Sequence, residues 1–147
     1  MTDELEIVKR EVPAPLLRWT GALLNRVAQQ VRDEFEGRLS GSGLKSKHYS
    51  ALILLEGGSA TQIELGRQLW VDRTSMVALV DDLERSGDVV RARHPDDRRA
   101  YSLSLTEQGR ATLQKARRIA DEVEADVFAP LSTGEREQLR ALLGKLI

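Results

Sequence analysis

TQIELGRQLWVDRTSMVALVDDLERSGDVVRARHPDDRRAYSLSLT, residues 61–106, is the stretch that decides the fold. A T-x-x-E capping box at Thr61 predicts a short helix that ends near residue 69. After a turn, Asp72 is a favourable N-cap for a second helix over 73–86. Apolar side chains recur in this second helix at i, i+3, i+4 and i+7 and predict one buried face: Met76, Leu79, Val80 and Leu83.

The second half of the same stretch alternates with a period of two, which predicts strands over 88–93 and 100–105. The loop between them, roughly 94–99, is polar, contains no glycine and is longer than a tight turn. Such a loop is expected to project from the surface. Two short helices followed by a hairpin with a basic tip are typical of a winged helix-turn-helix.

Helices are also predicted on both sides of this stretch. A long one covers 16–39, a short one 47–57, another 107–128, and the last follows an S-x-x-E box at Ser132. With a minor strand near Ser59 and an arm over residues 1–12, the predicted fold is mostly α with a small β-wing, in the order α-α-α-α-β-β-α-α. Apolar side chains expected to be buried in the two helices nearest Ser59 are Tyr49, Leu52, Ile53, Leu55, Ile63, Leu65 and Leu69.

The flanking helices carry apolar stripes with no obvious partner in their own chain. The stripe on the last helix comprises Leu139, Leu142, Leu143 and Leu146. Exposed on a monomer, it would favour aggregation, and a second copy across a two-fold axis is the simplest cover. We therefore expect one domain over 1–147, with a winged helix-turn-helix lobe at 46–105 and a helical dimerisation region at 13–40 and 107–147.

Composition narrows the functional classes. The 147 residues are 41% hydrophobic and 31% charged, with a net charge of −1, which excludes a broad basic surface but not a local one. The absence of cysteine excludes thiol catalysis and cysteine-based zinc sites. No apolar run could span a membrane and no signal peptide is evident, so a cytoplasmic location is expected. His48 and His94 have no nucleophile or carboxylate at motif spacing, and no metal or cofactor motif is present, so we expect no enzyme, metal or cofactor.

The second helix of a helix-turn-helix lies in the major groove of DNA and reads base edges with its N-terminal residues. The residues at those positions are Arg73, Thr74, Ser75, Val77 and Ala78. An arginine there can bond guanine, and a hydroxyl can bond a base or a phosphate. The alternative is that Thr74 and Ser75, with Asp72, serve only as capping residues.

The wing carries the second group of candidate DNA contacts. Arg91, Arg93, Arg98 and Arg99 contribute positive charge, and an arginine at a hairpin tip can enter the minor groove. Asp97 lies two residues from Arg99, where its carboxylate could hold the guanidinium in one orientation. The alternative for this segment is a solvated charged loop.

The run from Leu83 to Gly109, LERSGDVVRARHPDDRRAYSLSLTEQG, resembles the signature of the MarR family of bacterial transcription regulators. The matching positions are Leu83, Glu84, Gly87, Arg91, Asp97, Arg99, Leu103, Leu105, Thr106 and Gly109. The resemblance implies a homodimer that pairs through the first and last two helices on a pseudo-palindromic operator, with Arg99 in the minor groove and Asp97 as its anchor. Val77 and Ala78 depart from the Ser or Thr and Arg that the family often has.

The resemblance also implies a small aromatic or phenolic effector that releases the protein from DNA. Candidate contacts are Arg18, Trp19, Arg26, His48, Tyr49 and Arg91. The ordinary alternatives are a core or interface role for Trp19 and a helix-start role for His48. The predicted function is a homodimeric, ligand-released repressor, and the alternative is a winged-helix protein-interaction module without DNA binding.

Overall fold

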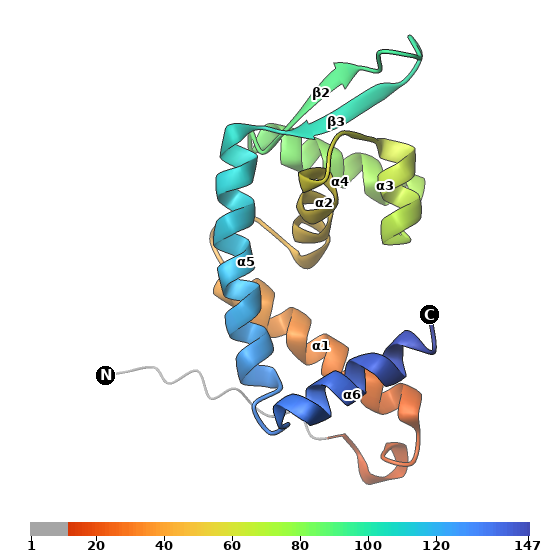
Figure 1. Cartoon of the computed structure of the whole chain (residues 1–147), viewed down its shortest axis with the longest axis vertical. Helices are drawn as coiled ribbons and strands as arrows, with labels where there is room; N and C mark the ends of the chain where they lie inside the picture. The colour runs from red at the N-terminus through yellow and green to blue at the C-terminus, as the bar shows by residue number, and fades with distance from the viewer. Residues whose placement is uncertain (1–11) are drawn as a thin grey trace, which may run out of the picture.

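The computed structural model describes residues 12–147, so the arm predicted over residues 1–12 lies almost wholly outside the described part. Within that part the chain is mostly helical with one three-stranded sheet, which confirms the predicted fold class (Figure 1). The elements are η1 (Ala14–Leu16), α1 (Thr20–Arg38), α2 (Ser46–Glu56), β1 (Ala60–Thr61), α3 (Gln62–Leu69), α4 (Arg73–Arg85), β2 (Val89–Arg93), β3 (Tyr101–Leu105), α5 (Glu107–Val127) and α6 (Thr133–Gly144).

The lobe at one end of the molecule packs α2, α3 and α4 against a small antiparallel sheet (Figure 1). The strand order is β1-β3-β2, and β2 pairs with β3 from Val89 opposite Leu105 to Arg93 opposite Tyr101. The largest fully buried side chains come from each of these helices, from β3 and from α5: Leu52, Leu65, Met76, Leu83, Leu103, Leu113, Val80 and Val123. The four apolar positions predicted for α4 are all buried, as their helical spacing requires.

A tight joint connects the wing to α5. The Thr106 hydroxyl accepts from the backbone N–H of Gly109 at 2.9 Å and donates to the Gly87 carbonyl at 2.6 Å. The buried carboxylate of Asp88 accepts from the Thr112 hydroxyl at 2.7 Å. A Cβ at Gly109 would lie 1.9 Å from the Asp88 carbonyl oxygen, so only glycine fits this contact. The L-x-L-T-x-x-G pattern is therefore the sequence of this joint.

Two arginines form ion pairs that join the long helices to each other and to the lobe. The Arg38 guanidinium, near the end of α1, donates to Asp126 of α5 at 2.5 Å and lies 3.7 Å from Glu122. Arg117 of α5 makes a two-pronged contact with Glu56 at the end of α2, at 2.6 and 3.2 Å. Figure 1 shows the result: α5 runs from the wing to the end where α1 and α6 lie. The position of the lobe is thus fixed relative to the outer helices.

Two predictions about helices and burial were wrong. The helix expected over 16–39 begins only at Thr20, because Trp19 is extended (φ −101°, ψ 110°) and separates it from η1. Ile63 is 68% exposed and Ile53 39% exposed, because each lies on the outward side of a helix that packs through its opposite face. Tyr101, at the outer end of β3, is half exposed because the hairpin extends beyond the helices beneath it.

Candidate nucleic-acid interface

The start of α4 presents an exposed polar face. Asp72 caps the helix: one carboxylate oxygen accepts from the backbone N–H of Ser75 at 2.9 Å and the other from its hydroxyl at 2.6 Å. These bonds lower the pKa of the Asp72 carboxyl, chiefly through the Ser75 hydroxyl. The cap thus engages the Ser75 side chain, whereas Arg73, Thr74 and Ala78 remain exposed without such a bond. Val77 is 42% exposed on the same side, away from the core.

The tip of the wing is shaped by side chains that bind the loop's own backbone. Asp97 accepts from the backbone N–H of Arg99 at 2.9 Å, and His94 accepts through Nδ1 from the backbone N–H of Asp96 at 3.1 Å. The expectation that Asp97 holds the Arg99 guanidinium was therefore wrong, because the carboxylate accepts from the backbone N–H of Arg99 instead. The carboxylate closes an Asx-type turn instead, which fixes the backbone from which the Arg99 side chain extends.

Arg91 has a different environment from the other wing arginines. Its guanidinium donates to Glu84 at 2.9 Å and lies 3.4 Å from Asp81, both on α4. The pair of carboxylates pins the base of the hairpin to the back of the preceding helix. Arg91 is therefore placed as a brace between β2 and α4, a position from which it supports the wing and neutralises acidic charge.

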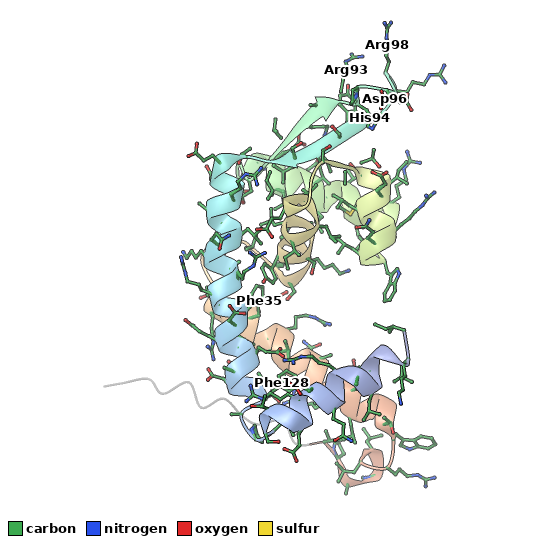
Figure 2. The ribbon with its side chains drawn as sticks, viewed as in Figure 1. Phe35, Arg93, His94, Asp96, Arg98 and Phe128 are labelled. Atoms are coloured by element: carbon green, nitrogen blue, oxygen red, sulfur yellow. The ribbon has the colours of Figure 1, made fainter. Side chains whose placement is uncertain are left out.

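Four arginines without an ion pair lie at the start of α4 and on the wing. In the described chain, Arg38, Arg85, Arg91, Arg117 and Arg140 form ion pairs, whereas Arg73, Arg93, Arg98 and Arg99 form none. Figure 2 shows Arg93 and Arg98 projecting from the outer end of the hairpin. A chain with a net charge of −1 can still concentrate uncompensated positive charge at the helix start and the wing. Arg93 was counted in the charge of the wing but was not among the predicted DNA contacts, although its place beside the loop is the signal that would have added it.

The six predicted effector contacts do not form one pocket in a single chain. His48 is 6% exposed and satisfied: Nδ1 accepts from the backbone N–H of Lys45 at 3.0 Å, and Nε2 lies 3.4 Å from Asp82. The Tyr49 ring packs 5.1 Å from that of Phe35, near the end of α1. Arg18 stacks on Trp19 at 4.9 Å, at the other end of that helix. A helix of 19 residues spans about 28 Å, which separates the two groups.

Two surface hollows bear on effector binding and on dimerisation. One, of about 700 Å³, lies between the end of α1, the start of α2 and α4, and is lined by residues that include Arg32, Lys45, Lys47, His48, Ser75 and Ala78. The other, of about 640 Å³, is almost wholly apolar and lies between α1, the end of α5 and α6. Of the predicted effector residues, only His48 lines the first hollow.

In residues 12–147, no helix is long and apolar enough to cross a membrane. The same part of the chain contains no group of three or more His, Asp or Glu residues arranged to hold a metal ion. A helix-turn-helix followed by a basic hairpin, with arginines free of ion pairs at the start of α4 and on the wing, is the architecture of a winged-helix DNA-binding protein.

Comparisons with known proteins give the family. A model of the MarR family matches residues 42–100. A probable transcriptional regulator from Pseudomonas aeruginosa is 34% identical, with a TM-score of 0.81 over 88% of this chain and 97% of that one. The transcriptional repressor CouR, solved on a 23-mer DNA duplex, is 31% identical, with a TM-score of 0.83 over 92% and 97%.

A MarR-family regulator from Rhodococcus sp. RHA1 is 30% identical, with a TM-score of 0.79 over 86% of this chain and 90% of that one. The chain belongs to the MarR family of transcription regulators, which are winged-helix DNA-binding proteins and generally not enzymes. These relatives do not favour the alternative of an interaction module without DNA binding.

Proposed function

We propose that this protein is a homodimeric repressor that binds a pseudo-palindromic operator in double-stranded DNA. The start of α4 enters the major groove, and Arg99, with Arg98 beside it, reaches the adjacent minor groove. The observation that carries this proposal is the absence of ion pairs at the arginines of those two places, Arg73, Arg93, Arg98 and Arg99, whereas Arg85 and Arg91 of the same lobe are paired with carboxylates. Arg73 and Thr74 are the residues best placed to read bases, since Val77 and Ala78 offer only apolar contacts.

The homodimer rests on the outer helices. None of the side chains of α6 is buried, although the helix is amphipathic and capped at Ser132. Leu142 and Leu146 are 52% and 72% exposed, and the neighbouring groove is lined by apolar side chains of α1 and α6. A second copy of residues 13–40 and 107–147 would cover this surface, and 46–105 would then act as the DNA-binding lobe of each copy.

Release by a small aromatic acid or phenol is supported by the hollow beside the recognition helix. Three cationic side chains, Arg32, Lys45 and Lys47, line this hollow and outnumber its two carboxylates, Glu36 and Asp82, so an aromatic carboxylate or phenolate would find cationic partners there. Ser75 and Ala78 line the same hollow, so a molecule bound there would occupy space next to the face proposed to meet DNA. Binding of the effector and binding of DNA would oppose each other, which is the linkage that release requires.

A gel-shift experiment tests the proposal. Overlapping fragments from the DNA upstream of the protein's own gene are titrated with protein at two salt concentrations, with unrelated DNA as competitor. We expect one fragment to shift at lower protein concentration than the others and to lose affinity as salt rises. A panel of aromatic acids and phenols is then added to the shifted complex. The absence of any salt-sensitive shift would contradict DNA binding and favour the interaction module.

A further inference from the structure

Trp70, in the turn between α3 and α4, is unusual in two independent ways. Its indole is 85% exposed, and its backbone is left-handed (φ 50°, ψ 45°). It is the single non-glycine residue with positive φ in residues 12–147. Left-handed backbone is unfavourable for bulky side chains, and glycine or asparagine adopts it more readily. An exposed indole buries little apolar surface that could offset this cost, so the needs of the fold do not explain a tryptophan here.

The surroundings of Trp70 are cationic. Arg67 precedes it by one helical turn and Arg73 follows it at the start of α4; neither forms an ion pair in the described chain. Both arginines line a groove of about 420 Å³ between α3 and α4, and Val71, next to Trp70, lines it too. Unpaired guanidinium groups on either side of a groove favour an anionic occupant.

The position within the motif identifies that anion. In a helix-turn-helix the first helix crosses the DNA backbone, and the second enters the major groove. Trp70 ends the first helix and precedes the second, so it stands where the chain passes the phosphates that border the groove. The apolar surface assigned to the homodimer lies on α1, α5 and α6 instead. DNA therefore fits this site better than a second copy of the chain does.

We propose that Trp70 is a DNA-backbone contact: its indole Nε1–H donates to a phosphate that Arg67 also binds, and its ring packs on the adjoining sugar. This inference rests on the proposed DNA-binding function and adds a contact outside the base-reading helix face and the wing. A phosphate contact adds affinity on any sequence and positions the protein on the duplex. The role of Trp70 in DNA binding then explains why a tryptophan occupies this strained left-handed position.

We expect replacement of Trp70 by glycine or asparagine to raise the stability of the fold and to lower the affinity for DNA. Trp70→Gly and Trp70→Asn relieve the backbone strain, so we expect the Tm to rise by about 3 °C. Both remove the indole, so we expect DNA affinity to fall by about tenfold for each half-site. The fall should be equal on operator and unrelated DNA. The slope of log affinity against log salt should not change, because an indole releases no counterion.

Trp70→Phe separates the ring from the donor. It keeps the strain and the packing but removes the N–H, so we expect the wild-type Tm and an affinity between those of the wild type and Trp70→Asn. Trp70→Phe also leaves Trp19 as the remaining tryptophan. Addition of DNA should therefore change the tryptophan emission of the wild type and leave that of Trp70→Phe unchanged.

The outcomes distinguish this inference from the function on which it rests. A wild-type protein that binds no DNA would remove the proposed function itself. If the wild type binds and Trp70→Asn binds equally well, only the Trp70 contact is overturned. Wild-type affinity in Trp70→Phe would overturn the hydrogen bond. A lowered Tm in Trp70→Gly, or dissociation of the homodimer in sedimentation, would assign the residue to folding or assembly and overturn the inference.

Discussion

At the scale of single residues, the wing contains arginines of two kinds, one paired with carboxylates and the others exposed and proposed to contact DNA. Arg91 forms ion pairs with Glu84 and Asp81, so its charge is largely neutralised within the protein. Arg99 is exposed and unpaired, and Asp97 fixes its backbone without occupying its guanidinium. The residue best prepared to meet a phosphate or a narrow minor groove is therefore Arg99.

Arg99→Ala should weaken DNA binding by about 1–3 kcal/mol and make the salt dependence shallower by about one unit of slope for each chain. Fluorescence anisotropy of a labelled duplex over a series of salt concentrations measures both quantities. Arg85→Ala is the matched control, because Arg85 is paired with Asp82 and lies at the opposite end of α4 from Arg73. Equal affinities of wild type and Arg99→Ala at every salt concentration would contradict the wing's role.

Gly109→Ala tests the joint between the wing and α5. The new Cβ would clash with the Asp88 carbonyl oxygen at 1.9 Å, and backbone must move to relieve the clash. We expect a loss of about 3 kcal/mol in the free energy of unfolding, measured by urea denaturation. Gly134→Ala is the control, because a Cβ at Gly134 meets nothing within 4 Å. Similar small effects of both substitutions would show that the joint tolerates displacement.

At the scale of elements, the parts predicted from sequence are those determined locally. The boxes at Thr61 and Ser132 and the cap at Asp72 form as expected, because each needs only a side-chain oxygen and the next helical turn. The predictions that were wrong concern features that depend on tertiary packing. Ile63 fits the helical pattern but faces outward, and nothing local indicates that Trp19 interrupts the first helix.

These caps predict a dependence of stability on pH. Hydrogen bonds from backbone N–H groups lower the pKa of the Glu64 and Glu135 carboxyls below their ordinary 4.5, chiefly through the N–H of Thr61 and of Ser132. Because the folded pKa is below the unfolded one, the stabilisation is present above about pH 4.5 and is lost as the pH falls through the folded pKa.

Glu64→Gln keeps a hydrogen-bonding side chain without the titrating group. Urea midpoints measured between pH 7 and pH 3 should therefore fall less steeply in Glu64→Gln than in the wild type. Glu137→Gln, an exposed α6 residue without a hydrogen bond, should follow the wild type. Parallel pH profiles for wild type and Glu64→Gln would mean that the cap carboxylate does not contribute.

Helix α6 supports a prediction about assembly. Truncation after Pro130 removes a helix that buries no side chain in its own chain but would leave the apolar surface of α1 uncovered. We expect the truncated protein to aggregate or to unfold as a monomer. Sedimentation velocity and circular dichroism test this expectation. A soluble truncated protein that still binds DNA would contradict the proposed interface.

At the scale of the whole molecule, the long helices position the lobe. Arg38 joins α1 to α5 and Arg117 joins α5 to α2, so the spacing of two lobes would follow from the geometry of α5 and the dimer interface (Figure 1). Sequence patterns predicted these elements but not the distribution of the predicted effector contacts, because the distance between Trp19 and Tyr49 depends on how α1 packs against α2 and α5. The hollow lined by Ser75 and Ala78 likewise arises from packing between distant segments.

The most direct test is the stoichiometry and salt dependence of one protein–DNA complex. The upstream fragment that shifts most strongly is labelled and titrated with protein at several salt concentrations, with fluorescence anisotropy as the readout. The mass of the complex is measured by sedimentation equilibrium. We predict two chains per duplex and a linear fall of log affinity with log salt. A single chain per duplex, or an affinity independent of salt, would contradict a homodimer that binds DNA through the arginines of α4 and the wing.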